Sequence, residues 1–398
     1  MKSPLNKLAA AAMLCAACCP ACVRAQSAAD SLSHAPLWHV GAGVAAGVVP
    51  GTNRFLTGDN SSGKSVDADF AASVRAGFRF SPYSRLGQLY PGVYQGLGLE
   101  ARTFSAGGLL GSPVSLYVYQ GVPLVHFGPR LWLGAEWQFG AAFGWKHFRA
   151  GIDEENGAVS TAVTAHMGVG LRLNYELSAS WRLTGGIDLR HFSNGNTSYP
   201  NAGVNTTGLS LGLTYLISQP QPQAPAPDEA LVAEADAGRW MLDIVAYGAW
   251  RKRGVTERED AIMVPGRFGV AGVQVAPMRK FNRWVAAGAS LDMQYDQSAG
   301  IENYWVEGTW GNDVKFYRPP FGKQLSVGLS AHAELTLPVF AINAGLGYDF
   351  VCPEGDRPFY QSLTLKAFVT RNVFLNVGYR LRHFKDPQNL MLGIGVRL

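Results

Sequence analysis

The sequence predicts an all-β fold in which antiparallel strands form outer-membrane β-barrels, and three observations lead to this fold class. Charged residues make up only 16% of the 398 residues, whereas about a quarter is usual in soluble domains. After the N-terminal region the chain has no run of about 18 apolar residues, so a transmembrane helix is not expected. Glycine (47 residues) and aromatic residues recur in short alternating runs, which is typical of barrels.

Residues 1–25 have the features of a signal peptide. Lys2 and Lys7 supply positive charge, residues 8–19 are apolar, and the expected cut follows Ala25. A lipoprotein anchor through one of the four cysteines in this segment is an alternative, although none lies in a convincing lipobox. An N-terminal membrane helix is disfavoured because the apolar run is short.

Cleavage after residue 25 would change the chemistry available to the mature chain. Cys352 would be the only cysteine left, so neither an intramolecular disulfide nor a cysteine metal site is expected. The net charge of +5 would fall to +2 with the loss of Lys2, Lys7 and Arg24. A charge this small does not predict a nucleic-acid partner.

Alternation with a period of two divides the rest of the chain into sixteen candidate strands. The first eight cover residues 38–49, 66–80, 94–104, 114–124, 131–145, 162–175, 181–192 and 206–216. The second eight cover 240–251, 266–278, 283–295, 322–337, 339–350, 359–370, 373–384 and 389–398. Strands of about 9 to 11 residues cross a bilayer at a tilt, and these segments are long enough.

Connection lengths alternate between long and short along both halves, with one exception at residues 81–93. Long outer loops and short periplasmic turns produce this rhythm in membrane barrels. The odd-numbered strands are therefore expected to run outward, which places residue 192 at the outer surface.

The two halves are related by an internal repeat. Residues 167–192 align without gaps on 359–384, and both segments end in Leu-Arg-His-Phe. Between the halves, residues 218–227 are rich in proline and are followed by acidic residues and alanines up to 238, which is typical of a linker. We expect two tandem eight-stranded barrels, at 26–217 and 239–398, joined by a linker at 218–238; a single sixteen-stranded barrel is the alternative.

A candidate site for chemistry follows the strand at 181–192. Continuing by two from Leu189 places His191 and Ser193 on the lipid-facing side. On the next strand, counting back by two from Leu209 brings Asn205 to the same face. A hydroxyl, an imidazole and an amide that orients the imidazole can support nucleophilic catalysis.

Further residues of this loop could complete the site. Asn194, Gly195, Asn196 and Asn201 offer donors for an oxyanion hole. No metal or other cofactor is required by such a mechanism. The same polar segment is also typical of an ordinary outer loop, so a non-catalytic barrel that acts as a pore, an anchor or a surface scaffold is the rival function.

Two other groups of residues have simpler structural interpretations. Asp188 and Arg190 are expected to form an ion pair in the barrel lumen. Five tryptophans are expected to anchor the barrels at the membrane interface, namely Trp38, Trp132, Trp145, Trp240 and Trp284.

The motifs His191-Phe-Ser-Asn-Gly and Pro200-Asn-Ala-Gly, followed by an amphipathic last strand, resemble the PagL family of lipid A 3-O-deacylases. The acyloxyacyl hydrolase branch of Bacteroides-like bacteria is the most similar, and residues 139–145 share this likeness. The resemblance covers 38–216. It implies an eight-stranded outer-membrane barrel with a serine-hydrolase site on its lipid-facing surface, acting on lipid A of lipopolysaccharide in the outer leaflet.

Under this resemblance, His191 corresponds to the general base and Ser193 to the nucleophile of a carboxylic ester hydrolase. Asn201 and the segment 194–196 correspond to the oxyanion region. The third member of the family site is a glutamate, whereas this chain has Asn205. Asp153, Glu154 or Glu155 on a neighbouring loop could replace that glutamate.

The second repeat lacks the same set of residues. His383 is present, but Lys385 stands where the first repeat has its serine, and the loop is shortened to 385–388. The second half is therefore expected to be catalytically inert.

Overall fold

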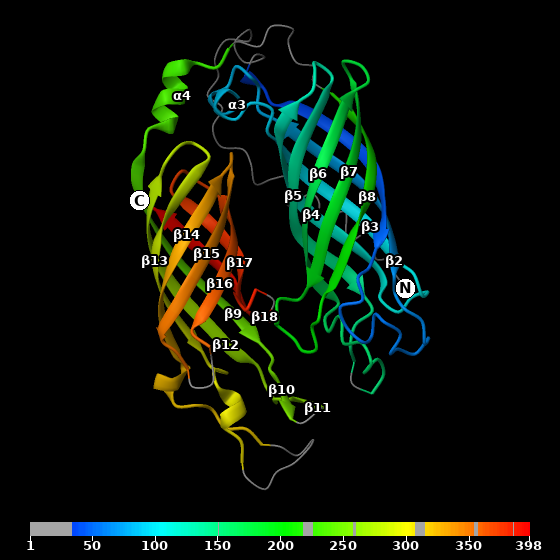
Figure 1. Cartoon of the computed structure of the whole chain (residues 1–398), viewed down its shortest axis with the longest axis vertical. Coiled ribbons are helices and arrows are strands. Elements are labelled where there is room, and N and C mark those ends of the chain that lie inside the picture. Colours follow the sequence, from blue (N-terminus) through cyan, green and yellow to red (C-terminus); the bar gives the residue numbers. More distant parts are fainter. Residues whose placement is uncertain are drawn as a thin grey trace, which may run out of the picture.

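The protein consists of two closed barrels of eight antiparallel strands each (Figure 1). The computed structural model describes residues 34–149, 151–217, 226–257, 260–306, 315–353, 357–384 and 386–398. The expected signal peptide at 1–25 lies outside the described residues. The eighth strand of each barrel pairs with the first strand of the same barrel. The prediction of two eight-stranded barrels is thus confirmed, and the alternative of one sixteen-stranded barrel is wrong.

The strands of the first barrel follow each other in sequence order around the sheet. They are β1 (Leu37–Val48), β2 (Ala68–Arg79), β3 (Tyr94–Phe104), β4 (Gly111–His126), β5 (Leu131–Trp145), β6 (Val163–Glu176), β7 (Trp181–Ser193) and β8 (Val204–Leu216). A short helix, α3 (Arg85–Leu89), lies between β2 and β3. Every predicted strand of this half is present, with its ends shifted by a few residues at most.

The second barrel has the same order of strands. They are β9 (Arg239–Arg251), β12 (Phe268–Lys280), β13 (Val285–Asp296), β14 (Leu325–Thr336), β15 (Phe340–Val351), β16 (Phe359–Phe368), β17 (Val373–Arg382) and β18 (Asp386–Arg397). A separate hairpin, β10 (Gly254–Glu257) with β11 (Asp260–Met263), lies at the end of the barrel that carries the long loops (Figure 1). The hairpin was not predicted, because it occupies a segment that reads as a long loop.

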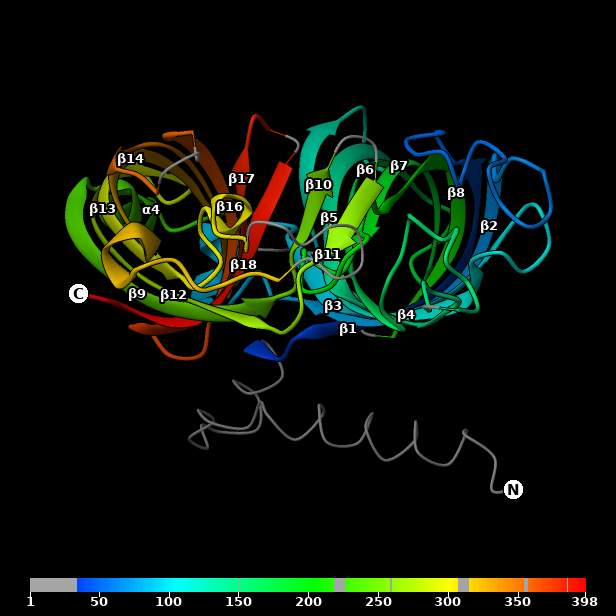
Figure 2. The same cartoon turned by 90° about the horizontal axis from the view of Figure 1, so that it is seen from below.

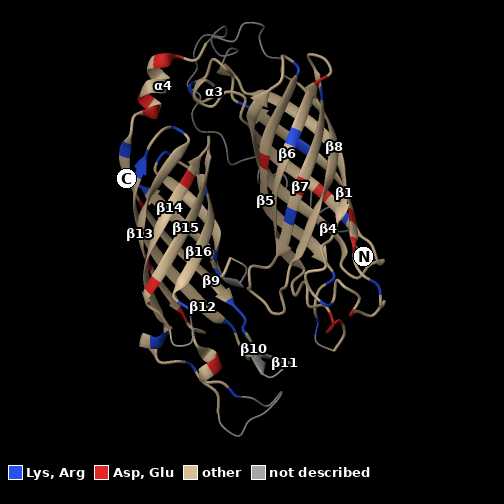
Figure 3. Ribbon diagram, viewed as in Figure 1, with Lys and Arg blue, Asp and Glu red and all other residues tan. Residues whose placement is uncertain are grey.

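The distribution of side chains is apolar outside and polar inside. Along β7, Ile187 and Leu189 are mostly exposed on the outer surface, whereas Asp188 and Arg190 between them are buried in the lumen. Most residues along the strands are neither Lys, Arg, Asp nor Glu (Figure 3). A barrel built in this way is suited to lipid around it.

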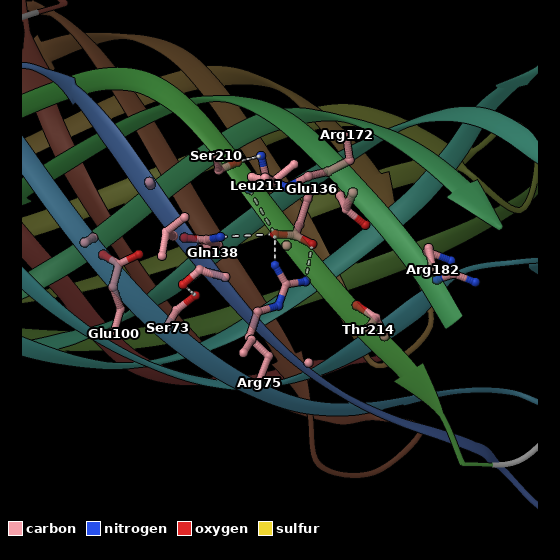
Figure 4. Close-up of a pocket in the computed structure, with 18 of the residues that line it drawn as sticks. Ser73, Arg75, Glu100, Glu136, Gln138, Arg172, Arg182, Ser210, Leu211 and Thr214 are labelled. Atoms are coloured by element: carbon pink, nitrogen blue, oxygen red, sulfur yellow. Dashed lines mark hydrogen bonds and ion pairs between the residues drawn. The ribbon is translucent and has the colours of Figure 1, made fainter. Parts of the chain in front are cut away.

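Charged side chains fill the lumen of the first barrel. Arg75 and Arg172 both form ion pairs with Glu136 (Figure 4), and Arg172 also reaches Asp188. Arg190 lies 3.5 Å from Asp188, which confirms the predicted lumen ion pair. The cavity left among these groups measures about 60 Å³. Filled interiors of eight-stranded barrels conduct poorly, so this lumen does not favour a pore.

The two barrels stand side by side (Figure 2), and residues of β5, β6 and β7 line a common groove with residues of β15, β16 and β17, the equivalent strands of the second repeat. Trp137 of β5 packs edge-on against Phe340 of β15, with ring centroids 5.0 Å apart. Gln120 Nε2 donates to the carbonyl oxygen of Pro338 at 2.7 Å. The long loops of both barrels lie at one end of the molecule, and α3 lies at the other (Figure 1). Both barrels therefore have the same orientation relative to a membrane.

Part of the segment between the barrels is ordered as a helix. The acidic residues form α4 (Glu229–Asp236), where Asp228 Oδ1 accepts from the backbone N–H groups of Ala230 and Leu231. A capping aspartate and a run of good helix formers favour this conformation. The helix packs on Leu89 and Tyr90 next to α3 rather than being fully solvated. Residues 218–225 lie outside the described residues.

None of the helices in the described part of the chain has the length and apolar character needed to cross a membrane.

The expectation of an interface belt holds for only some of the five tryptophans. Trp38 and Trp240 are at least half exposed on the barrel surface. Trp132 and Trp145 are buried, so the prediction is wrong for both. Trp132 has the same inward parity on β5 as Glu136, and Trp145 enters an apolar cluster beneath the long loops. Trp284 makes a T-shaped ring contact with Tyr90, next to α3 and α4. It is therefore in contact with protein and does not project freely into lipid.

Candidate active site

His191 and Asn205 form the best-defined pair of the site. The antiparallel register of β7 and β8 places them directly opposite each other on the outward face. His191 Nδ1 lies 2.7 Å from Asn205 Oδ1. A carbonyl oxygen can only accept, so Nδ1 carries the proton and Nε2 is left as an acceptor. The amide thereby selects the tautomer that a general base requires.

Ser193 lies two residues beyond His191, at the end of β7. Its side chain is buried, with 5% of the residue exposed. Its Oγ is 3.2 Å from the hydroxyl of Tyr379, which comes from β17 of the second barrel. Among the described residues, no hydrogen bond joins Ser193 to His191. Such bonds are often long before substrate binds.

The residues next to His191 and Asn205 in the chain point into the barrel and hold this part of β7 and β8 in place. Phe192 and Val204 are fully buried in the apolar cluster under the outer loops. The backbone N–H of Gly203 donates to Ala158 O, which ties the 194–203 loop to the preceding loop. Gly203 has a φ of +75°, and a β-carbon there would lie 2.9 Å from Cε1 of His191. Glycine is needed here for both reasons.

Of the four residues expected to supply oxyanion donors, Asn194 and Asn201 have different hydrogen-bond partners. The side-chain amide of Asn194 donates to Ser160 Oγ at 2.8 Å and to the carbonyl of Ser198 at 3.0 Å, so it braces the loop. Asn201 Oδ1 accepts from the backbone N–H of Asn194 at 3.1 Å. This contact leaves the Asn201 amide nitrogen available as a donor, and Asn201 lines the space in front of Ser193.

Gly195 and Asn196 form the turn of the loop. Both have positive φ angles, of 68° and 61°. Gly195 lies against Leu390 and Tyr379 of the second barrel, because a β-carbon at Gly195 would meet both. The turn therefore lies at the contact between the barrels.

The acidic residues of the neighbouring loop are all engaged away from His191. Hydrogen bonds from Arg149 hold the pKa of Asp153 below its ordinary value. Glu154 accepts from the backbone of Gly151, and Glu155 accepts from the backbone of Ser61. None of these three carboxylates replaces the family glutamate beside the imidazole in this structure.

The corresponding part of the second repeat has a different geometry. β17 ends at Arg382. His383 has a φ of +52° and its Nε2 lies 3.2 Å from Arg357 Nη1. Lys385 lies outside the described residues. The histidine of the second repeat is thus turned out of the strand that would align it with a neighbouring nucleophile.

A groove opens between the barrels in front of Ser193. Its volume is about 720 Å³, within the range of ligand sites. Its walls are mainly apolar and come from both barrels, with His191, Ser193, Asn201 and Asn205 on one side. In the part of the chain that the structure describes, no group of three or more His, Cys, Asp or Glu side chains could hold a metal ion.

Comparisons with known proteins identify two matching families of sequence. The family described as lipid A 3-O-deacylase (PagL) matches residues 117–214. The family described as the C-terminal domain of acyloxyacyl hydrolase (PagL_C) matches residues 240–398. No curated protein matches the chain.

Solved structures of outer-membrane proteins are also similar to the chain. Neisserial surface protein A has 14% identity over 45% of this chain and 97% of its own, with a TM-score of 0.30. The siderophore receptor PirA from Pseudomonas aeruginosa has 9% identity over 92% of this chain and 81% of its own, with a TM-score of 0.22.

Proposed function

Because this chain belongs to the PagL family of lipid A deacylases, we propose that it hydrolyses an ester-linked 3-hydroxyacyl chain of lipid A with Ser193 and His191. The observation that carries the proposal is the His191–Asn205 pair beside a buried serine, at the mouth of an apolar groove. Imidazole, hydroxyl and amide groups on the outward face of a barrel are costly in lipid unless they have partners or a function.

The protein is an outer-membrane β-barrel, and the finer aspects of its placement are part of the proposal. Export would use the segment 1–25 as a cleaved signal peptide. The loops that follow β1, β3, β5 and β7 would face outward, so Ser193 would lie at the level of the outer leaflet. Lipid A of lipopolysaccharide would then reach the site laterally, from within the membrane.

The proposed reaction proceeds through an acyl-enzyme. Nε2 of His191 takes the proton from Ser193 as Oγ attacks the ester carbonyl. The same nitrogen then protonates the departing sugar oxygen, and the acyl chain remains on Ser193. Water, activated by His191, releases the chain as a free 3-hydroxy acid and restores the serine. The Asn201 amide would donate to the carbonyl oxygen as its negative charge develops.

The test of the function is mass spectrometry of lipid A from cells that express the protein. We expect lipid A to lose the mass of one 3-hydroxyacyl chain, compared with cells that carry an empty vector. The free 3-hydroxy acid should appear in the same cells. Unchanged lipid A in cells with a folded barrel in the outer membrane would contradict the proposal and would favour a non-catalytic scaffold.

Substitution of Asn205 tests its role beside the imidazole. Asn205→Asp keeps the contact to His191 Nδ1 but makes it a charge-assisted hydrogen bond, which is stronger by about 1 kcal/mol. Because this stabilises the imidazolium formed during the reaction, we expect kcat to rise about fivefold. Asn205→Leu removes the acceptor and should lower kcat about tenfold or more. Equal rates for both variants and the wild type would show that Asn205 does not orient His191.

A further inference from the structure

The two barrels contact each other at two levels, and the groove runs beside and between these contacts. At the outer level, Ser193 contacts Tyr379 of the second barrel. At the inner level, Trp137 packs against Phe340 and Gln120 bonds to Pro338 O. The space of about 720 Å³ extends from Asn201 and Leu381, beyond the outer contact, to Trp137 at the inner contact.

The walls of this space run inward from the nucleophile along the strands. In the first barrel, strand pairing places Met167 level with His191 and Val169 two residues further in, beside Trp137. In the second barrel, Val377 lies two residues inward from Tyr379 and pairs with Leu365. Met167, Val169, Val377 and Leu365 present only apolar atoms or a thioether to the groove.

The depth of the groove is set by the position of Trp137. By register, Trp137 lies four strand residues inward from the level of Ser193, which is roughly 13 Å along a strand. A largely apolar space that passes the serine nucleophile and continues inward parallel to the strands suits an extended hydrocarbon chain. Carbohydrate or phosphate groups would find few hydrogen-bond partners along these walls.

The second barrel is tied to the reactive end of this space. Tyr379 points outward from β17, yet only 8% of it is exposed because the first barrel covers it. Its hydroxyl is the hydrogen-bond partner of the Ser193 hydroxyl. A barrel that only anchored the enzyme would not need to contact the nucleophile.

We propose that the second barrel forms one wall of the acyl site, and that the Trp137–Phe340 contact is the floor that limits the length of the acyl chain accepted. This inference rests on the proposed function, because it takes Ser193 as the nucleophile. It assigns a specificity role to a barrel that lacks a nucleophile of its own at the matching position.

The test compares the hydrolysis of p-nitrophenyl butyrate, octanoate, dodecanoate and palmitate by the full-length protein in detergent. Val377→Trp fills the groove from the second barrel. It should lower kcat/KM for dodecanoate by at least tenfold relative to butyrate, because the long chain loses its space. Phe340→Ala deepens the groove, so palmitate should gain at least tenfold relative to dodecanoate.

Leu375→Trp is the matched control, because Leu375 is an exposed outward residue of the same strand and does not line the groove. It should leave the chain-length profile unchanged. If Val377→Trp and Phe340→Ala also keep the wild-type profile while hydrolysis depends on Ser193, the acyl-site proposal is overturned and the proposed function stands. If the wild type shows no hydrolysis that depends on Ser193, both fail.

Discussion

Replacing Ser193 by alanine is expected to lower kcat/KM for lipid A deacylation by about 10⁴-fold or more. The substitution removes the oxygen that attacks the ester carbonyl, and no acyl-enzyme can form without it. The groove and the donor at Asn201 are left in place. Substrate should therefore still bind, and the loss should appear in kcat rather than in KM. Release of free 3-hydroxy acid, quantified by mass spectrometry, measures the effect.

Ser198→Ala is the control for this substitution, because Ser198 belongs to the same loop and contributes a backbone carbonyl to Asn194. That carbonyl is retained in the alanine variant, so the loop and the activity should be preserved. Heat-dependent gel migration would establish that both variants form closed barrels. Full activity of Ser193→Ala would show that the nucleophile lies elsewhere.

The barrel architecture could be predicted from the sequence because each strand carries its own signal. In β14, for example, apolar residues alternate with serine, histidine and glutamate along the whole strand. The same parity placed His191 and Asn205 on one face, and the register of β7 and β8 then made them neighbours. Alternation fixes which side of the sheet a residue faces, so adjacent strands can be related without further information.

What alternation cannot show is which part of a barrel surface meets another barrel. Tyr379 has the parity and composition of a lipid-facing aromatic residue, and nothing local distinguishes it from Tyr348 of β15. Only the packing of the second barrel on β5, β6 and β7 brings it to Ser193, which is 186 residues away in the chain. For the same reason, the groove and its floor at Trp137 were not foreseen.

Short-range signals also misled the prediction at a few positions. Trp145 follows Gly144, whose φ of +90° interrupts the alternation at the end of β5. The side chain therefore turns into the apolar cluster beneath the loops. Period-two alternation read from the sequence cannot predict such an interruption, because the break appears only in the backbone conformation.

Replacing His191 by glutamine is expected to lower kcat about 10³-fold, because general base and acid catalysis contributes about 10²- to 10⁴-fold. Glutamine is of similar length and can still donate to Asn205 Oδ1, so the loop should keep its form. It cannot accept the proton of Ser193 and return it to the leaving oxygen. Single-turnover measurements with lipid A in detergent would separate this chemical step from binding and release.

The chain provides its own matched control at His383, which lies in the second copy of Leu-Arg-His-Phe. His383 is exposed, its φ is positive, and its Nε2 lies 3.2 Å from Arg357 Nη1. His383→Gln should therefore leave kcat unchanged. If it reduced activity as much as His191→Gln, the histidine of this motif would support the stability of the barrel end rather than proton transfer. A loss confined to His191→Gln would assign proton transfer to the histidine of the first barrel alone.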